Sequence, residues 1–256
     1  MRESAPAGKK EVMDEKPYLS LVIPAYNEEL RLPGTLRSVV DYLSAQPYGS
    51  EIVVVDDGSE DGTAGIARGM GGGPIPVRLC AHPDGSNRGK GAAVKLGMTL
   101  ATGEYRLFMD ADNSTTIEQV EGFWPAFEEG CEVVIGSRKA PGAQIVVRQT
   151  WYKEMAGRAG NLFIRLLAAP GISDTQAGFK AFTRRSAEQI FPRLTIDRWG
   201  YDFEILAIAR ALHYRIREIP IRWVNSPDSK VRAVSYLQVL GEVWHVHRNR
   251  KAGRYR

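Results

Sequence analysis

Short runs of apolar residues recur along the first half of the chain, and polar residues follow each run. The run from Glu51 to Asp56 is continuous and β-branched, which is typical of a strand buried on both faces. Similar runs lie at residues 18–24, 77–81, 105–109 and 132–135. Helical spacing of apolar residues fills the intervals, at residues 36–43, 63–70, 91–101 and around 117–123. Strands that alternate with helices predict an α/β fold with a mostly parallel sheet covered on both faces.

The pattern changes beyond residue 138, where helical spacing dominates. We expect a loop at residues 141–148, one short strand at 217–223, and helices at residues 150–168, 186–191, 202–212 and 236–246. No internal repeat and no long linker divides the chain. We therefore predict a flexible tail over residues 1–18, one α/β domain over residues 19–228, and a C-terminal helix with a basic tail over residues 229–256.

The composition is that of an ordinary globular chain. Of 256 residues, 43% are hydrophobic and 25% are charged, which excludes collagen, low-complexity disorder and a disulfide scaffold. Cys80 and Cys131 lack metal-site spacing, so we expect reduced thiols in a cytoplasmic protein. The apolar stretch Leu162–Pro170 is short and contains Arg165, and the N-terminal residues carry mixed charges. We therefore expect neither a transmembrane segment nor a signal peptide.

The formal charge of +4 conceals an uneven distribution along the chain. Residues 1–137 carry 12 basic and 21 acidic side chains, a charge of −9, whereas residues 138–256 carry 22 basic and 9 acidic ones, a charge of +13. This asymmetry suggests that the C-terminal part meets an anionic partner, such as a nucleic acid, a phosphorylated ligand or a membrane surface. The alternative is that the two halves offset each other within one folded surface.

Charged and polar residues gather at the carboxyl ends of the predicted strands. They are Asn27 and Glu28, Asp56 and Asp57, Arg88 and Lys90, Asp110 and Asp112, and Arg138. Ligands of open parallel sheets bind at this edge. We therefore expect the functional site to be built from these side chains.

The triplet Asp110-Ala111-Asp112 stands where a buried strand meets a loop. Two carboxylates two residues apart can hold Mg²⁺ or Mn²⁺, and the cation can then bridge to the oxygens of a diphosphate. The competing interpretation of such a triplet is a plain turn. Its position after the fourth predicted strand favours the metal site.

Two further motifs suit a nucleotide. Asp56-Asp57-Gly58-Ser59 can accept hydrogen bonds from a base or a ribose, although the same residues also mark an ordinary strand-to-helix turn. Asn87-Arg88-Gly89-Lys90-Gly91 offers two cations for a diphosphate and glycines that allow close backbone approach. The alternative for this second motif is a basic surface turn.

Several familiar motifs are absent from the sequence. No GxGxxG follows the first strand and no GxxxxGK[ST] occurs, which argues against a dinucleotide site and excludes a P-loop. Neither GxSxG nor HExxH is present. The four histidines are scattered, and the pair His245 and His247 is more typical of a surface than of a metal site.

Taken in order, the motifs resemble those of the family 2 glycosyltransferases with the GT-A fold. The N-terminal motifs that carry the resemblance are Val22-Ile-Pro-Ala-Tyr-Asn-Glu28, Val55-Asp-Asp-Gly-Ser59, Asn87-Arg-Gly-Lys-Gly91, Asp110-Ala-Asp112 and Val134-Ile-Gly-Ser-Arg138. Three downstream segments, Ile172–Lys180, Arg198–Leu206 and Glu218–Trp223, are similar to those of the dolichyl-phosphate β-glucosyltransferases and their prokaryotic relatives. The resemblance covers about residues 19–245.

The resemblance implies the transfer of a hexose from a nucleotide sugar, UDP-glucose, to a polyprenyl phosphate with inversion at the anomeric carbon. Asp56 would contact the base, while Asp110 and Asp112 would bind the ribose or the donor phosphates together with Mg²⁺ or Mn²⁺. The donor-binding residues that it implies are Pro24, Ala25, Tyr26, Glu28, Asp56, Asp57, Arg88, Lys90, Asp110, Ala111 and Asp112.

On the acceptor side, the resemblance implies that Arg138 and Arg148 bind the acceptor phosphate. A phosphate monoester is largely dianionic at neutral pH and already nucleophilic, so a strong general base is less necessary than for a sugar hydroxyl. Asp174 would orient the acceptor or an arginine, and Lys180 would stabilise the departing diphosphate. Asp202 and Glu204 are further candidates, whose alternative is an acidic first turn of a helix.

Relatives in the polyprenyl-phosphate group often carry a membrane anchor, and we find none in this sequence. Residues 150–168 and the basic end from Arg248 to Arg256 could contact a bilayer peripherally, at the cytoplasmic face. The alternative for residues 150–168 is a helix that covers the sheet. Other functions stay open, namely a GDP-mannose donor, a soluble acceptor, or a non-catalytic protein that binds a nucleotide sugar. We expect no nucleic-acid partner, because no RNP-type aromatic motif is present.

Overall fold

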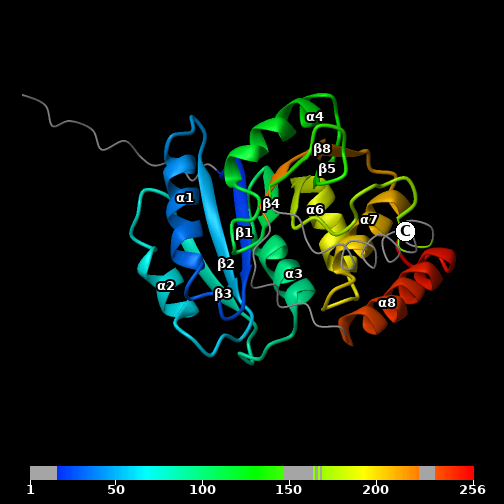
Figure 1. Cartoon of the computed structure of the whole chain (residues 1–256), viewed down its shortest axis with the longest axis horizontal. Helices are drawn as coiled ribbons and strands as arrows, with labels where there is room; N and C mark the ends of the chain where they lie inside the picture. Colours follow the sequence, from blue (N-terminus) through cyan, green and yellow to red (C-terminus); the bar gives the residue numbers. More distant parts are fainter. Residues whose placement is uncertain (1–15, 147–163, 165–166, 168, 225–233) are drawn as a thin grey trace, which may run out of the picture.

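A seven-stranded sheet forms the centre of the molecule (Figure 1). The structure, a computed structural model, describes residues 16–146, 164, 167, 169–224 and 234–256. The strand order is β3-β2-β1-β4-β7-β5-β8, and only β7 runs antiparallel to its neighbours in the described sheet. The strands are β1 (Leu19–Ala25), β2 (Ser50–Asp56), β3 (Val77–Ala81), β4 (Tyr105–Met109), β5 (Val133–Ser137), β7 (Phe179–Thr183) and β8 (Ile216–Pro220). The predicted mostly parallel sheet is confirmed.

Strand β7 was not expected from the sequence. It lies between β4 and β5 and pairs with both, with Lys180 opposite Phe108 on one side and Ile135 on the other. Its sequence, FKAFT, has a lysine at the second position, just as β3 (VRLCA) and β4 (YRLFM) have an arginine there, so its local pattern is that of a strand. The lysine is nevertheless fully buried.

The helices lie close to their predicted positions. They are α1 (Leu32–Ser44), α2 (Thr63–Gly69), α3 (Lys90–Leu100), α4 (Trp124–Glu128), α6 (Arg184–Ile190), α7 (Tyr201–Ala211) and α8 (Val234–Lys251), with 3₁₀ helices η1 (Ile117–Phe123) and η2 (Phe191–Arg193). The segment around 117–123, expected as a helix of α type, is the 3₁₀ helix η1, and α4 begins after it with Pro125 in its first turn. The predicted helix at 150–168 lies almost entirely outside the described residues.

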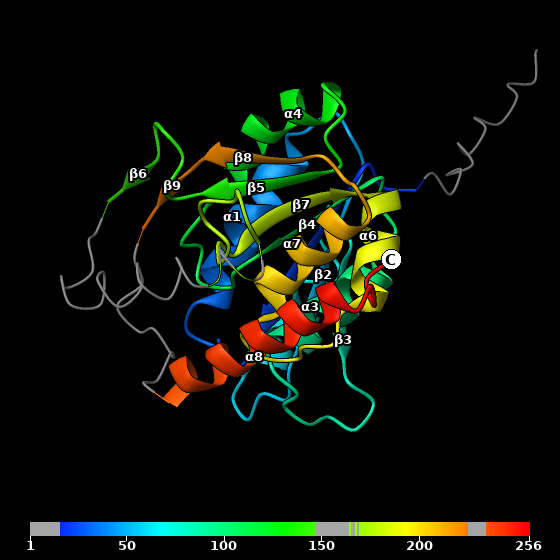
Figure 2. The ribbon, with the colours of Figure 1, turned by 90° about the vertical axis from the view of Figure 1, so that its right-hand side faces the viewer.

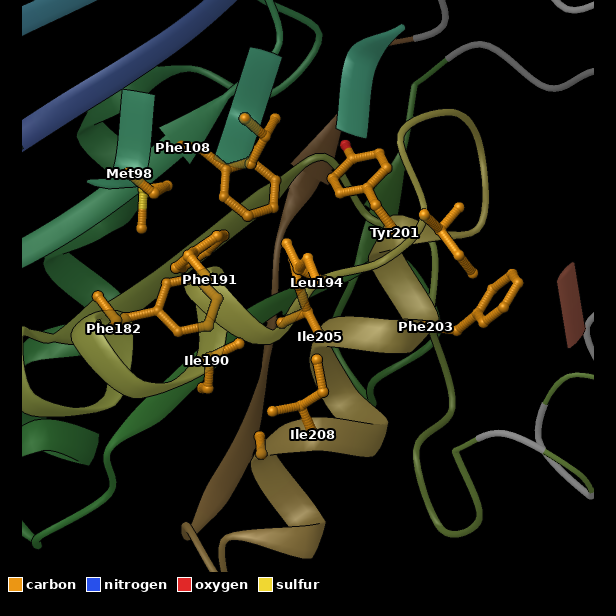
Figure 3. Close-up of a cluster of buried hydrophobic side chains, with 14 of the residues drawn as sticks. Met98, Phe108, Phe182, Ile190, Phe191, Leu194, Tyr201, Phe203, Ile205 and Ile208 are labelled. Atoms are coloured by element: carbon orange, nitrogen blue, oxygen red, sulfur yellow. The ribbon is translucent and has the colours of Figure 1, made fainter. Parts of the chain in front are cut away.

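Alternate side chains of the strands supply a core on each face of the sheet. In β2, Ile52 and Val54 belong to the cluster that packs against α1, whereas Val53 and Val55 belong to the cluster under α3, α6 and α7. Figure 3 shows the centre of this second cluster, where Phe182 and Phe191 come together from β7 and η2. None of the described helices combines the length and the apolar character that a bilayer crossing requires.

A small two-stranded sheet extends from one side of the main sheet (Figure 2). It is made of β6 (Gln144–Ile145) and β9 (Arg222–Trp223), which run parallel. The predicted loop at 141–148 therefore contains a strand, and the predicted strand at 217–223 divides into β8 and β9. The residue at the division, Ile221, is buried.

The end of the described chain packs against α7 through one aromatic residue. The predicted final helix extends further than expected, to Lys251, and Tyr255 beyond it is only 2% exposed. The Tyr255 hydroxyl donates a hydrogen bond of 2.8 Å to Oε1 of Glu204 in α7. Part of the predicted basic tail is therefore anchored in the core.

Gly97 in α3 permits the helix to approach the sheet. A Cβ atom at this position would overlap Cγ1 of Val22 and lie 2.8 Å from Cγ2 of Val55, and both valines are fully buried. Gly65 in α2 is the opposite case, since a Cβ atom there would meet nothing within 4 Å. The two helical glycines thus differ in their packing.

We expect opposite effects from the same substitution at the two glycines. Gly97→Ala should lower the free energy of unfolding by about 1–3 kcal/mol, because the added methyl overpacks the core. Gly65→Ala should raise it by about 0.5–1 kcal/mol, because alanine favours a helix. Urea unfolding followed by circular dichroism measures both, and a stabilised Gly97→Ala variant would contradict the close packing of α3.

Candidate active site

The loops after β1 and β2 are bound to each other at the carboxyl edge of the sheet. Ala25 is opposite Asp56 in the parallel register, and its carbonyl accepts a hydrogen bond from the Asp57 N–H. The N–H of Glu28 donates to Oγ1 of Thr63 at 2.7 Å, and the Glu28 carboxylate forms a bidentate pair with Arg31. Pro24 and Ala25 are buried, whereas the Tyr26 side chain beside them is exposed. This edge is therefore a rigid rim.

Asp56 and Asp57 have different partners. Oδ1 of Asp56 accepts the Ser59 N–H at 3.1 Å, in a tight turn. Both oxygens of Asp57 accept backbone hydrogen bonds of 2.9 Å, from the N–H groups of Arg88 and Gly89. Burial raises the pKa of the Asp57 carboxyl above its ordinary value, although these two donors act to lower it. Asp57 thus holds the basic loop in place.

The basic loop approaches its neighbours closely at two glycines with positive φ. At Gly58 (φ 74°), a Cβ atom would lie 2.7 Å from the backbone nitrogen of Asn87. At Gly89 (φ 108°), it would lie 2.6 Å from the carbonyl oxygen of Asp197. Both positions favour glycine on conformation and on space. The sequence predicted that the glycines of the basic loop approach a ligand; in the structure Gly58 and Gly89 make close approaches to other backbone segments of the protein.

Lys90 turns inward to the first carboxylate of the Asp110-Ala111-Asp112 triplet. Its Nζ lies 2.5 Å from Oδ1 of Asp110, whose side chain is 31% exposed. Burial alone would lower the pKa of Lys90, but the charges of Asp110 and Asp202 help to raise it well above its ordinary value. Lys90 is therefore a permanent cation beside the predicted metal site, whereas the Arg88 side chain pairs with Asp84 at the exposed rim.

The two aspartates of the triplet have different partners, since Asp110 pairs with Lys90 and Asp112 turns back to its own loop. Asp112 accepts the Ser114 N–H with Oδ1 at 3.0 Å, and Ala111 between the two aspartates is tied to Thr35 through its carbonyl. In the described part of the chain no group of three or more His, Cys, Asp or Glu side chains could hold a metal. Two carboxylates fit Mg²⁺ or Mn²⁺ where substrate phosphates and water supply the remaining ligands.

Arg138 and Asp174 form a buried, bidentate ion pair. Nε and Nη2 of Arg138 donate to the two Asp174 oxygens at 2.7 and 2.8 Å, and its backbone N–H donates to the same carboxylate at 3.0 Å. Asp174 is 1% exposed, and Glu218 in β8 fixes its backbone by accepting the Asp174 N–H. Although burial acts to raise it, the pairing lowers the pKa of Asp174 to about 2. The Arg138 guanidinium also lies over the Trp223 ring, 5.4 Å from its centre.

Lys180 in β7 and Asp202 in α7 form a second buried ion pair. Nζ of Lys180 lies 2.5 Å from Oδ1 of Asp202, and it also donates to the Ala177 carbonyl. Lys180 is fully buried and Asp202 is 7% exposed. This arrangement gives Lys180 a positioning role toward Asp202, rather than direct access to a bound diphosphate.

Glu204 serves the structure rather than the site. Its carboxylate is fully buried and accepts hydrogen bonds from the N–H groups of Thr195 and Ile196, as well as from the hydroxyls of Thr195 and Tyr255. It connects the segment before α7 to the end of the chain. Glu204 does lie in the first turn of α7, as the alternative interpretation expects, but its carboxylate binds groups outside the helix.

The structure gathers most of the predicted site residues at one edge of the sheet. Arg148 lies outside the described residues. Sequence reasoning missed Glu218, which accepts the N–H groups of Ser173 and Asp174 and the Ser137 hydroxyl. Its signal was available, since Glu218 is a single acidic residue in the apolar segment before Trp223.

Comparison with known proteins gives a consistent family. The model of glycosyl transferase family 2 matches residues 20–191. The dolichyl-phosphate beta-glucosyltransferase of Dictyostelium discoideum is 35% identical over 224 residues, covering 84% of this chain and 68% of the relative. The enzyme of the same name from Mus musculus is 33% identical over 264 residues, covering 91% of this chain and 79% of the relative.

Two kinds of solved structure share the fold. Glucosyl-3-phosphoglycerate synthase from Mycobacterium tuberculosis, in complex with Mn²⁺, UDP-glucose and phosphoglyceric acid, has a TM-score of 0.63 at 19% identity, covering 90% of this chain and 80% of its own. A mannosyltransferase from Pyrobaculum calidifontis, in complex with GDP-Man and Mn²⁺, has a TM-score of 0.59 at 22% identity, covering 91% of this chain and 64% of its own. The predicted GT-A fold is confirmed.

The lowered pKa of Asp174 predicts a pH-dependent contribution to stability. The pKa of Asp174 is about 2 in the folded protein, below its ordinary value of 3.8. The ionised side chain therefore stabilises the fold fully at pH values above 3.8, and this stabilisation is lost as the pH falls toward 2. Asp174→Asn should therefore lower the free energy of unfolding by at least about 2 kcal/mol at pH 7 and by clearly less at pH 3.

Urea unfolding at the two pH values measures the effect, with Asp41→Asn on the surface of α1 as the matched control that should change little. An Asp174→Asn variant as stable as the wild type at pH 7 would contradict the buried ion pair.

Proposed function

This chain belongs to glycosyl transferase family 2, among relatives of the dolichyl-phosphate β-glucosyltransferases, and is a hexosyltransferase; we propose that it transfers glucose from UDP-glucose to a polyprenyl phosphate. The product would be a β-linked lipid phosphate sugar, formed with inversion. Support comes from relatives that carry this activity in their names at 32–35% identity over most of the chain. The proposal is that UDP-glucose is the donor and a polyprenyl phosphate the acceptor.

The observation that carries the proposal is the placing of opposite charges at one edge of the sheet. The carboxylates of Asp110 and Asp112 follow β4, and the Arg138 guanidinium follows β5. These groups are close enough that Asp110, after Asp174, helps to raise the pKa of Arg138 against its burial. A site with both charges can hold a cation with its diphosphate on one side and a phosphate anion on the other.

We assign the donor to the acidic side of this edge. Pro24, Ala25 and Tyr26 would line the nucleoside pocket. Asp56 would contact the nucleobase, and Glu28 would lie beside this pocket. Asp110 and Asp112 would hold Mg²⁺ or Mn²⁺, which when bound neutralises charge on the donor diphosphate. Lys90 adds a fixed positive charge next to Asp110. Asp57 acts on the donor indirectly, because its carboxylate holds the backbone of the basic loop.

We assign the acceptor phosphate to Arg138. Asp174 occupies Nε and Nη2 of the guanidinium, and no described residue contacts Nη1 within hydrogen-bond distance. The phosphate would bind on this outer side. An acceptor oxygen then attacks the anomeric carbon as the bond from that carbon to the diphosphate oxygen breaks, and UDP departs with the bonding electrons. Asp174 remains ionised throughout, since its low pKa makes it a poor base.

Lys180 and Asp202 would act as positioning residues. Asp202 lies at the first turn of α7, where Lys180 neutralises part of its charge, and both Lys90 and Asp110 interact with it electrostatically. The pair therefore keeps a balanced set of charges under the donor phosphates. Arg148 stays a predicted second ligand of the acceptor phosphate, and peripheral membrane contact stays part of this proposal.

The central experiment measures nucleotide release and lipid product together. Purified full chain with UDP-glucose, Mn²⁺ or Mg²⁺ and a polyprenyl phosphate in detergent should release UDP and form a glucosylated lipid with a β-anomeric proton signal. Release of GDP from GDP-mannose, and not of UDP from UDP-glucose, would show that the proposed donor is wrong. Product formed only with phosphoglyceric acid would show that the proposed acceptor is wrong. Absence of product from every pair would overturn the enzymatic proposal.

Asp112→Asn tests the assignment of the cation. The variant keeps the size of the side chain but loses the negative charge, so turnover should fall at least about 100-fold, since charge stabilisation at a transition state is worth several kcal/mol. Mn²⁺ binding in the presence of UDP, followed by electron paramagnetic resonance, should weaken in parallel. Asp41→Asn is the control, and unchanged Mn²⁺ binding in Asp112→Asn would remove Asp112 from the metal site.

A further inference from the structure

The small sheet of β6 and β9 exposes aliphatic side chains that the proposed reaction does not use. Ile145 is 46% exposed, Val146 49% and Val224 37%. We call β6 and β9 with Val146 and Val224, which follow them, the apolar arm. It extends away from the main sheet at the carboxyl ends of β5 and β8 (Figure 2). Consecutive strand residues point to opposite faces, so Ile145 shares a face with its partner Trp223, whereas Val146 and Val224 follow on the other side.

The apolar arm is held rigidly against the site. The Val146 N–H donates to the Trp223 carbonyl at 3.0 Å, and the Val224 N–H donates to the Ser114 carbonyl at 2.9 Å. Ser114 is two residues beyond Asp112, so the arm is tied to the loop of the predicted metal site. Gln119 of η1 adds a second attachment, because its side-chain amide donates to the Arg222 carbonyl at 2.8 Å.

One face of the arm continues from the acceptor arginine. Ile145 is directly opposite Trp223 in the β6–β9 register, and side chains of directly paired residues lie on the same face of a sheet. The Trp223 ring lies under the Arg138 guanidinium, 5.4 Å away. Arg138, Trp223 and Ile145 therefore lie in a row, with a cation first, an aromatic ring next and an aliphatic side chain last. A phosphate monoester of an apolar alcohol matches this row, because its anionic phosphate is followed by an apolar chain.

We propose that the apolar arm binds the isoprenoid chain of the acceptor, with Trp223 and Ile145 contacting the units nearest to the phosphate on Arg138. This inference rests on the proposed function and adds the part of the protein that recognises the lipid. A soluble acceptor such as a phosphorylated acid would place a polar group against Ile145, which offers no hydrogen bond. The arm thus selects the apolar class of acceptor.

The test uses a short acceptor that is soluble as a monomer, citronellyl phosphate, so that no bilayer takes part. Ile145→Ser should raise the KM for citronellyl phosphate about fivefold to tenfold, because half of an isoleucine side chain loses its apolar contact. The kcat and the KM for UDP-glucose should stay within twofold of the wild type. Leu100→Ser is the matched control, since Leu100 is 38% exposed at the end of α3, at the opposite edge of the sheet.

The outcomes separate the inference from the function on which it rests. Wild-type protein that glucosylates no polyprenyl phosphate overturns the proposed function and the inference together. Wild-type turnover with an unchanged KM in Ile145→Ser overturns the inference alone. If Ile145→Ser affects only acceptor embedded in vesicles and leaves citronellyl phosphate unchanged, the arm contacts the bilayer rather than the acceptor chain, and the inference is wrong. Urea unfolding of each variant shows that the fold is kept.

Discussion

The Lys180–Asp202 ion pair lies between β7 and α7, and the candidate site depends on it. Lys180 is fully buried, and a buried charge without a partner would cost several kcal/mol. With Asp202 in place, the central strand β7 can carry a cation directly beneath the carboxyl edge of the sheet. Lys90 and Asp110 form a second pair that interacts electrostatically with Asp202, so opposite charges are already balanced before any ligand binds.

The acidic side chains of the site differ in how many of their oxygens are already bound by the protein. Asp57, Asp174 and Glu204 are acidic, but each has its oxygens occupied by donors of the protein. Their role is to hold loops and an arginine in place. Asp112 uses one oxygen for the Ser114 N–H, and Arg138 uses Nε and Nη2 for Asp174, so under the proposed function each keeps polar atoms for a ligand. A reaction between two anions requires such fixed positioning.

Much of this arrangement was predictable because the apolar runs and the residues after them have a simple spacing. Strands β1 to β5 were predicted from their apolar runs, and the charged residues after them from the rule that ligands bind at the carboxyl ends of parallel strands. Strand β7 was missed because its place in the sheet depends on pairing with β4 and β5, which lie far back in the sequence, and the partner of its Lys180, Asp202, is 22 residues away. The pairing of Arg138 with Asp174 spans 36 residues; the sequence suggested that Asp174 orients the acceptor or an arginine, and the structure shows that it binds Arg138.

The antiparallel direction of β7 has a consequence for how such a protein can vary. Strand β5 ends at the site, and β7 begins at the same edge of the sheet, so the intervening residues 138–178 start and finish on one side of the molecule. Within this interval the described residues Ala169, Ile172 and Asp174 are buried, whereas residues 144–146 are exposed. Changes at the exposed residues 144–146 would therefore reshape the surface beside Trp223 while leaving the strands of the main sheet unchanged, and we expect differences between related chains to gather there.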